Sequence, residues 1–157
     1  MKLTTFSHHF GQEAISSNVS NTVSKIILST KFNFETSKSA DLRKLIMNQL
    51  KLKEGWSDEI RIQQKHGLTI TSIKDDVGLC FQTGNMSRFY ADLLKLQTLY
   101  IKDKISAAIY ILPTKKVAEK IGTNVVNSER LIMELKLFKH TITVPLLVIA
   151  LDEDEEE

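Results

Sequence analysis

The polar residues best placed for chemistry gather in one stretch of the chain. Gln82–Asn85 follows an apolar run and contains a glycine, and Arg88, Asp92 and Lys95 come next at spacings of four and three residues. On a helix these spacings put the three charged side chains on one stripe. Two interpretations are open. The stripe binds phosphate or positions an active-site strand, or it is a ladder of surface ion pairs, each worth about 0.3–0.5 kcal/mol.

Phosphodiester hydrolysis is one chemistry that such a stretch would suit, provided that carboxylates lie near it. Magnesium prefers hard oxygen ligands at about 2.1 Å. The nearby candidates are Asp75 and Asp76 in a predicted turn, and Asp58 and Glu59 earlier in the chain. None of the four stands in an acid-x-acid or acid-x-Lys pattern on a strand. Gln82, at the end of a predicted strand, is typical of a metal-binding or water-orienting group.

Hydrophobic periodicity predicts a series of helices and strands around this stretch. The predicted helices are Glu13–Ser29, Asp41–Lys53, Met86–Ile101, Lys115–Ile121 and Asn127–Phe138. The predicted strands are Glu59–Gln63, Leu68–Ile73, Val77–Phe81, Ile105–Leu112 and Ile142–Leu151. Hairpin strands followed by a crossover helix and buried strands predict an α/β domain with a mixed sheet. We expect the last three strands to lie side by side, with Met86–Ile101 packed across them.

Composition favours one globular domain with an unequal distribution of charge. The 157 residues are 42% hydrophobic and 25% charged, and the single cysteine, Cys80, excludes a disulfide framework. The net charge is +2, but Asp152–Glu157 are all acidic, so residues 1–151 carry +8. We expect a single domain over residues 1–151 and a disordered acidic tail over residues 152–157. The tail either competes for a basic nucleic-acid-binding surface or only keeps the chain soluble.

Membrane insertion and secretion are not predicted. No apolar run reaches the roughly 18 residues of a membrane helix, and the first residues lack the apolar region of a secretory signal. We expect a soluble, cytoplasmic protein with no membrane partner.

Five segments resemble one enzyme family. They are Phe6–Glu13, Leu45–Trp56, Val77–Asn85, Tyr90–Gln97 and Ile142–Ile149. In this order they resemble the start, a helix before the sheet, the catalytic strand, the following helix and the closing strand of BglII/BstYI-type restriction endonucleases, within the PD-(D/E)XK nuclease superfamily. The resemblance implies a restriction-endonuclease-like core with a mixed β-sheet flanked by helices. It also implies Mg²⁺-dependent cleavage of double-stranded DNA by a homodimer.

The family pattern is an Asp on one strand and Glu-x-Gln or Glu-x-Lys on the next. Gln82 matches the last position of that pattern, whereas Cys80 stands in place of the Glu and Thr71 near the place of the Asp. A thiol is a soft ligand and a hydroxyl brings no charge, so both metal-binding positions are degenerate. Asp75 and Asp76 are then the candidate metal ligands, because both lie close to the hairpin.

We expect a DNA-binding protein that resembles a type II restriction endonuclease. If it hydrolyses DNA, Asp75 or Asp76 holds Mg²⁺, Gln82 orients water or phosphate, and Lys95 neutralises phosphate. The predicted DNA-contacting residues are Arg43, Lys44, Asn85, Arg88 and Lys95. One alternative is a catalytically inactive nuclease fold that serves as an interaction or regulatory module. Another is an unrelated α/β protein with a basic surface, which a strand order unlike that of the nuclease core would favour.

Overall fold

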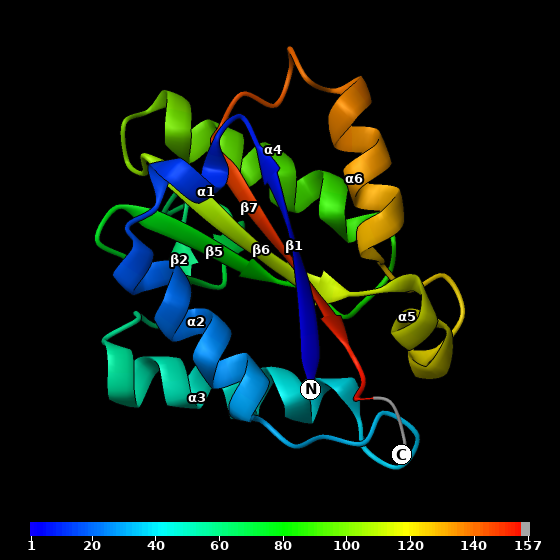
Figure 1. Cartoon of the computed structure of the whole chain (residues 1–157). Helices are drawn as coiled ribbons and strands as arrows, with labels where there is room; N and C mark the ends of the chain where they lie inside the picture. Colours follow the sequence, from blue (N-terminus) through cyan, green and yellow to red (C-terminus); the bar gives the residue numbers. More distant parts are fainter. Residues whose placement is uncertain (155–157) are drawn as a thin grey trace.

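The computed structural model describes residues 1–154 and contains a mixed β-sheet between two layers of helices (Figure 1). Its strands are β1 (Lys2–His8), β2 (Ile60–Arg61), β3 (Thr69–Ile70), β4 (Ser72–Lys74), β5 (Val77–Phe81), β6 (Ala107–Pro113) and β7 (Leu146–Asp152). Its helices are α1 (Gly11–Ala14), α2 (Ser17–Ser29), α3 (Ser39–Glu54), α4 (Arg88–Ile101), α5 (Lys115–Ile121) and α6 (Ser128–Leu137).

Five strands form the main sheet, in the order β1-β7-β6-β5-β4. The three central strands are parallel, and β1 and β4 run antiparallel to their neighbours at the two edges. β2 and β3 form a separate two-stranded ribbon. Because β5, β6 and β7 are parallel, their carboxyl ends all lie at the same end of the sheet.

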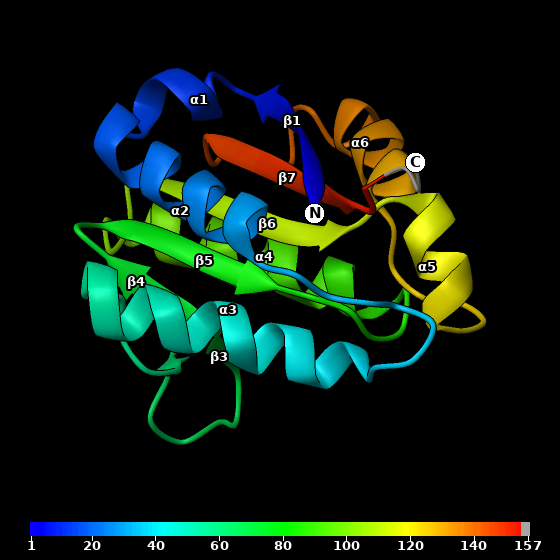
Figure 2. The same cartoon turned by 60° about the horizontal axis from the view of Figure 1, so that its bottom comes forward.

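Successive side chains of the central strands point to opposite faces of the sheet, and they contribute to two hydrophobic layers. On β5, Val77, Leu79 and Phe81 pack with residues of α2 and α3, whereas Cys80 packs with residues of α4 and α6. Figure 2 shows the sheet between these helix layers. All five residues of β5 are buried, as expected for a parallel strand covered on both faces. The end of β5 is therefore held on a rigid support.

Local signals explain how several helices begin and end. The side chains of Ser16, Thr114 and Asn127 accept backbone N–H bonds at the starts of α2, α5 and α6. Such caps satisfy backbone donors that the helix itself leaves free. α3 ends at Gly55, whose φ of 73° is the left-handed conformation that glycine adopts without strain.

The expected α/β class and the central sheet are confirmed. β5, β6 and β7 are neighbours, and α4 packs across them. The predicted helices correspond to α2, α3, α4, α5 and α6, with shifts of a few residues at their ends.

One strand was missed, and the bounds of two predicted strands are wrong. β1 was not predicted, because its pattern KLTTFSH is polar at an edge where four of seven side chains are exposed. The predicted strand Leu68–Ile73 is two strands, since β3 pairs with β2 and β4 pairs with β5. The final strand starts at Leu146 rather than Ile142, because Pro145 interrupts it; Ile142 and Val144 are buried in the preceding loop.

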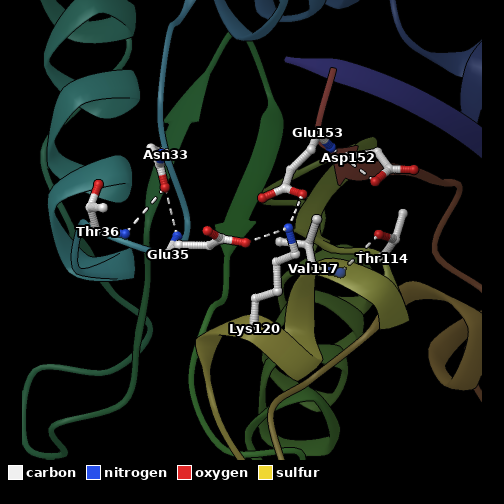
Figure 3. A network of polar contacts seen from close by, with 8 residues as sticks. All are labelled: Asn33, Glu35, Thr36, Thr114, Val117, Lys120, Asp152 and Glu153. Atoms are coloured by element: carbon white, nitrogen blue, oxygen red, sulfur yellow. Dashed lines mark hydrogen bonds and ion pairs between the residues drawn. The ribbon is translucent and has the colours of Figure 1, made fainter. Parts of the chain in front are cut away.

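The acidic segment does not begin as a disordered tail at residue 152. Asp152 is the last residue of β7 and lies opposite Lys2 of β1. Glu153 Oε2 lies 2.6 Å from Lys120 Nζ, and Asp154 Oδ2 lies 2.9 Å from the Met1 amino group. Figure 3 shows Lys120 between Glu153 and Glu35. Residues 155–157 lie outside the described part of the chain. Within residues 1–154, no helix is long and apolar enough to cross a membrane.

Candidate nucleic-acid interface

A pocket of about 300 Å³ lies where β5 ends, and we call it the α3–α4 pocket. Its walls come from α3, the loop before β2, β3, the end of β5 and α4. The lining residues are Arg43, Glu59, Thr69, Ile70, Thr71, Phe81, Gln82, Arg88, Ala91, Asp92 and Lys95. The stretch that the sequence singled out therefore forms one wall, and α3 supplies the opposing cation.

Gln82 is fixed at the end of β5 by three hydrogen bonds. Its backbone N–H donates to Ile111 O at 2.9 Å, which extends the pairing of β5 with β6. Its Nε2 donates to Asp92 Oδ2 at 3.0 Å, and its Oε1 accepts the Gly84 N–H at 3.0 Å. A Cβ atom on Gly84 would lie 2.9 Å from Gln82 Oε1, so any other residue here would force the Gln82 amide to shift. The amide of Gln82 is thereby oriented before any ligand binds.

Asp92 is the centre of a buried polar network. Its Oδ2 accepts hydrogen bonds from Gln82 Nε2 at 3.0 Å and from the Tyr110 hydroxyl at 2.8 Å, and its Oδ1 lies 3.0 Å from Lys95 Nζ. Both carboxylate oxygens are thus engaged. Because Asp92 is buried, this part of the charged stripe is not a surface ladder of ion pairs. A buried carboxylate needs such partners to offset the loss of hydration.

The thiol and the phenol beneath Asp92 stay protonated. Burial, together with the nearby Asp92 charge, raises the pKa of the Cys80 thiol well above its ordinary value. The same two causes, in the same order, raise the pKa of Tyr110 well above its ordinary value. Cys80 and Tyr110 are partners in the parallel pairing of β5 with β6. The Cys80 position therefore offers a neutral, enclosed thiol rather than an anionic ligand.

Three cations converge on the α3–α4 pocket. Lys95 is held by Asp92, whereas the guanidinium groups of Arg43 and Arg88 make no hydrogen bond or ion pair within residues 1–154. Arg43 Nε is also buried and has no acceptor within residues 1–154. The carboxylates that face these cations are Asp92 and the exposed Glu59.

A second pocket of about 320 Å³ continues this surface along α3. It shares Arg43, Glu59 and Thr71 with the α3–α4 pocket, and Lys44 and Lys51 add two further cations. Lys51 is paired with Asp58 at 2.8 Å. Together the two pockets form a groove with more basic than acidic side chains.

Comparison with known proteins assigns the chain to a family. The family model described as restriction endonuclease BglII/BglIII matches residues 3–151, which is nearly the whole chain. The chain belongs to the BglII/BglIII restriction endonuclease family. No curated protein matches the chain in sequence.

Two solved structures confirm the restriction-endonuclease fold. A crystal structure of restriction endonuclease BglII complexed with a DNA 16-mer matches with a TM-score of 0.84 and 15% identity, over 100% of this chain and 79% of that one. A crystal structure of free BglII matches with a TM-score of 0.79 and 16% identity, over 100% and 82% of the two chains. The expected mixed sheet flanked by helices is thus confirmed, and the reading as an unrelated α/β protein is not supported.

The structure brings some of the predicted site residues together and separates others. Gln82, Arg88, Lys95, Arg43 and Thr71 all line the α3–α4 pocket. Lys44 lines the adjoining pocket. Asn85 lies in the turn before α4, where its Oδ1 accepts hydrogen bonds from Ser87 N and Oγ, each at 2.9 Å.

The two turn aspartates lie away from this pocket. Asp75 and Asp76 are exposed and have positive φ angles of 46° and 60° in the turn before β5. Gln82 follows the opposite end of that strand. At a rise of about 3.3 Å per residue, roughly 20 Å separate Asp76 from Gln82. The structure does not bring the predicted metal ligands to the residue that was expected to act with them.

The side chains present do not fit the Mg²⁺ site that BglII/BglIII membership implies. Cys80 is buried in the layer under α4 and α6, and the Thr71 hydroxyl accepts the Phe81 N–H at 3.0 Å. Both oxygens of Asp92 already accept protein donors. Among residues 1–154, no group of three or more His, Cys, Asp or Glu side chains is arranged to hold a metal ion. Magnesium needs several hard oxygen ligands, and only Glu59 remains uncommitted in the pocket.

Sequence reasoning missed the roles of Asp92, Tyr110 and Glu59. A signal for Tyr110 was available, because its hydroxyl interrupts the otherwise apolar strand AAIYILP and a buried hydroxyl usually has a partner. The spacing of Asp92 and Lys95 indicated an ion pair but could not show that it is buried. Glu59 was named only as one of four nearby carboxylates, because its place in the wall depends on how the β2–β3 ribbon folds back.

Proposed function

We propose that this member of the BglII/BglIII family binds double-stranded DNA through the α3–α4 pocket and the adjoining groove, and that it does not cleave DNA with Mg²⁺. The observation that carries the proposal is the convergence of Arg43, Arg88 and Lys95 at the end of β5. Arginine is suited to phosphate because its planar group donates two parallel hydrogen bonds to an oxyanion.

The comparisons support DNA as the ligand. The protein of known structure with a TM-score of 0.84 was crystallised with a DNA 16-mer. The surface of the present chain adds an independent reason, since residues 1–151 carry +8 and the groove contains Lys44 beside the three pocket cations. Basic groups that neutralise backbone phosphates release counterions and thereby drive binding.

The absence of Mg²⁺-dependent cleavage follows from the donor chemistry of the pocket. Metal-dependent hydrolysis needs carboxylates that are free to coordinate, whereas Asp92 is committed to Gln82, Tyr110 and Lys95. Cys80 and Thr71 supply no negative charge in the degenerate positions. This agrees with the alternative of an inactive nuclease fold that acts by binding.

The same proposal includes a two-fold homodimer. α4 and α6 carry exposed apolar side chains, among them Leu94, Ile101, Met133 and Leu137. A largely apolar pocket of about 140 Å³ lies between α4 and the segment that follows α6, and it is lined by Tyr90, Leu93, Leu94, Phe138, Thr141 and Ile142. Palindromic DNA is read by two equivalent subunits, and apolar surface favours such an association. Light scattering at tens of micromolar should give the mass of a dimer, and a monomer would contradict this part.

The experiment that tests the proposed function is a titration of a fluorescent duplex at two salt concentrations. We expect binding that weakens steeply with salt, with a log–log slope of about −0.9 for each phosphate neutralised. For variants of the pocket cations, Lys102→Gln is a suitable control, because it removes an exposed positive charge outside the pocket lining. Failure of the wild type to bind any duplex would overturn the proposal.

A plasmid-cleavage assay with Mg²⁺ tests the catalytic half separately. We expect weak or no cleavage by the wild type. Robust site-specific cleavage that disappears in Asp75→Ala or Asp76→Ala would contradict the proposal and identify those residues as the metal ligands.

A further inference from the structure

We infer that the α3–α4 pocket is a metal-independent oxyanion site, in which Arg43, Arg88 and Lys95 hold one phosphate of the DNA backbone. This inference rests on the proposed function and adds to it. It assigns a ligand to the pocket and states that protein cations take the place in which the family implies Mg²⁺.

Arg43 gives the first reason. Its Nε is buried, and no acceptor within residues 1–154 reaches it. The side chain lines both pockets of the groove, so the guanidinium group borders the space that a ligand would occupy. A buried donor without an acceptor is unfavourable, and a ligand oxygen would remove that penalty. An oxyanion offers such an oxygen and also compensates the charge of the guanidinium group.

Arg88 gives the second reason. Its guanidinium group makes no hydrogen bond or ion pair with the described residues, although Asp92 lies one turn away on α4. Instead the side chain lies over Gly84, where a Cβ atom would be 3.4 Å from both Arg88 Cδ and Nη1. The Arg88 side chain therefore lies beside Gly84 and the oriented amide of Gln82. The arginine is placed at the pocket and stays available for a ligand.

Lys95 gives the third reason, and its partner explains the loss of the metal. The Lys95 ammonium lies 3.0 Å from Asp92 Oδ1, which places a fixed positive charge on the one buried carboxylate of the pocket. A divalent cation would have to displace that ammonium and would also meet repulsion from Arg43 and Arg88. Lysine keeps two further N–H donors for a ligand. The pocket therefore has three positive side chains and two negative ones, Asp92 and the exposed Glu59, so its net charge is positive.

The first test uses inorganic sulfate as the probe. Thermal unfolding is measured in sodium sulfate and in sodium chloride at equal ionic strength, for the wild type, Arg43→Gln, Arg88→Gln and the control Lys102→Gln. Sulfate strengthens burial in any protein, so the quantity of interest is the difference between variants. We expect a larger rise of Tm in the wild type and control than in the two arginine variants. An equal rise in all four proteins would overturn the inference.

The second test measures duplex binding in EDTA and in Ca²⁺. We expect dissociation constants that agree within about twofold, and a loss of at least about tenfold in the double variant Arg43→Gln with Arg88→Gln. Circular dichroism establishes that each variant is folded, and each arginine variant alone provides a second measurement if the double variant is not.

The outcomes separate this inference from the proposed function. Duplex binding that requires Ca²⁺ would overturn the inference and leave DNA binding by the protein standing. Duplex binding that the arginine variants leave unchanged would overturn the inference and also the placement of the DNA in the α3–α4 pocket. Variant-dependent stabilisation by sulfate without duplex binding would assign the pocket to a free anion, and would overturn both the DNA ligand and the proposed function.

Discussion

Two charged regions of the molecule differ in whether their cations have carboxylate partners. In the Lys120 cluster, formed by Met1, Glu35, Lys120, Glu153 and Asp154, each named cation faces a carboxylate. Figure 3 shows the Lys120 pairs. Lys120 Nζ lies 2.6 Å from Glu153 and 3.2 Å from Glu35, and these hydrogen bonds hold the pKa of its ammonium above the usual value. In the α3–α4 pocket, two of three cations have no such partner.

The difference distinguishes charged groups that join distant parts of the chain from charged groups that can bind a ligand. The Lys120 cluster links the segment before α3, α5 and the end of β7, so its pairs join distant parts of the chain. The α3–α4 pocket instead combines a buried, fully bonded anion, Asp92, with arginines that the fold leaves unpaired. We therefore expect stability to depend strongly on Asp92 and ligand binding to depend on the arginines, whereas the Lys120 cluster should affect both weakly.

The largest expected effect on stability comes from Asp92→Ala. The change leaves Tyr110, Gln82 and Lys95 without an acceptor in a buried site, and should lower the free energy of unfolding by about 3 kcal/mol. Glu153→Gln in the exposed cluster should cause little change. Urea unfolding of both variants measures the contrast, with Asp92→Asn as a conservative control that retains one oxygen. Equal losses for Asp92→Ala and Glu153→Gln would contradict the distinction.

A smaller effect should appear as a dependence of stability on alkaline pH. Burial raises the pKa values of Cys80 and Tyr110, whose ordinary values are 9.0 and 10.0. Above about pH 9 the unfolded chain loses these protons while the folded chain keeps them, so stability should fall as pH rises from there. Cys80→Ala should make this fall less steep, whatever its effect at neutral pH.

The exposed cluster provides the control for that pH series. The raised pKa of Lys120 also acts in the direction of lost stability, but only above its ordinary value of 10.5. Lys120→Gln should therefore leave the slope between about pH 9 and pH 10 unchanged. A slope that depends on Lys120 and not on Cys80 would reverse the assignment.

The smallest effect concerns the acidic residues at the end of the chain. The carboxyl ends of β5 and β7 lie at one edge of the sheet with β6 between them, about 10 Å apart. Deleting residues 155–157 removes three negative charges. Duplex affinity should rise by about two- to fivefold at low salt and by less at 0.15 M. Equal affinity with and without these residues would show that they do not compete with DNA.

Much of the fold could be predicted from local pattern. The helical spacing of Phe89, Leu93 and Leu96 and the continuous apolar run of β6 each point to one structure, because a layer covered on both faces leaves little choice of residue type. The exposed edge strand β1 left no such pattern. The split between β3 and β4 depends on a change of partner strand, which the apolar alternation of residues 68–73 does not encode.

The candidate site was predicted only in part, for the same reason. Gln82, Arg88 and Lys95 belong to one continuous stretch, so a short strand, a turn and a helix are enough to place them together. Asp75 and Asp76 are just as near to Gln82 in sequence, yet an extended strand of five residues carries them to the opposite end of the sheet. Nearness along the chain favours contact in a helix and separation in a strand.

Residue order by itself determined the α/β class, the central strands, the helix across them and the absence of acids at Thr71 and Cys80, because these depend on side-chain type and local periodicity. Tertiary structure decided that Arg43 of α3 faces Arg88 and Lys95 of α4, and that Asp92 is buried against Tyr110 of β6. Those contacts join segments far apart in the chain. Their charges acquire partners, or remain free for a ligand, only after the sheet and both helix layers have packed.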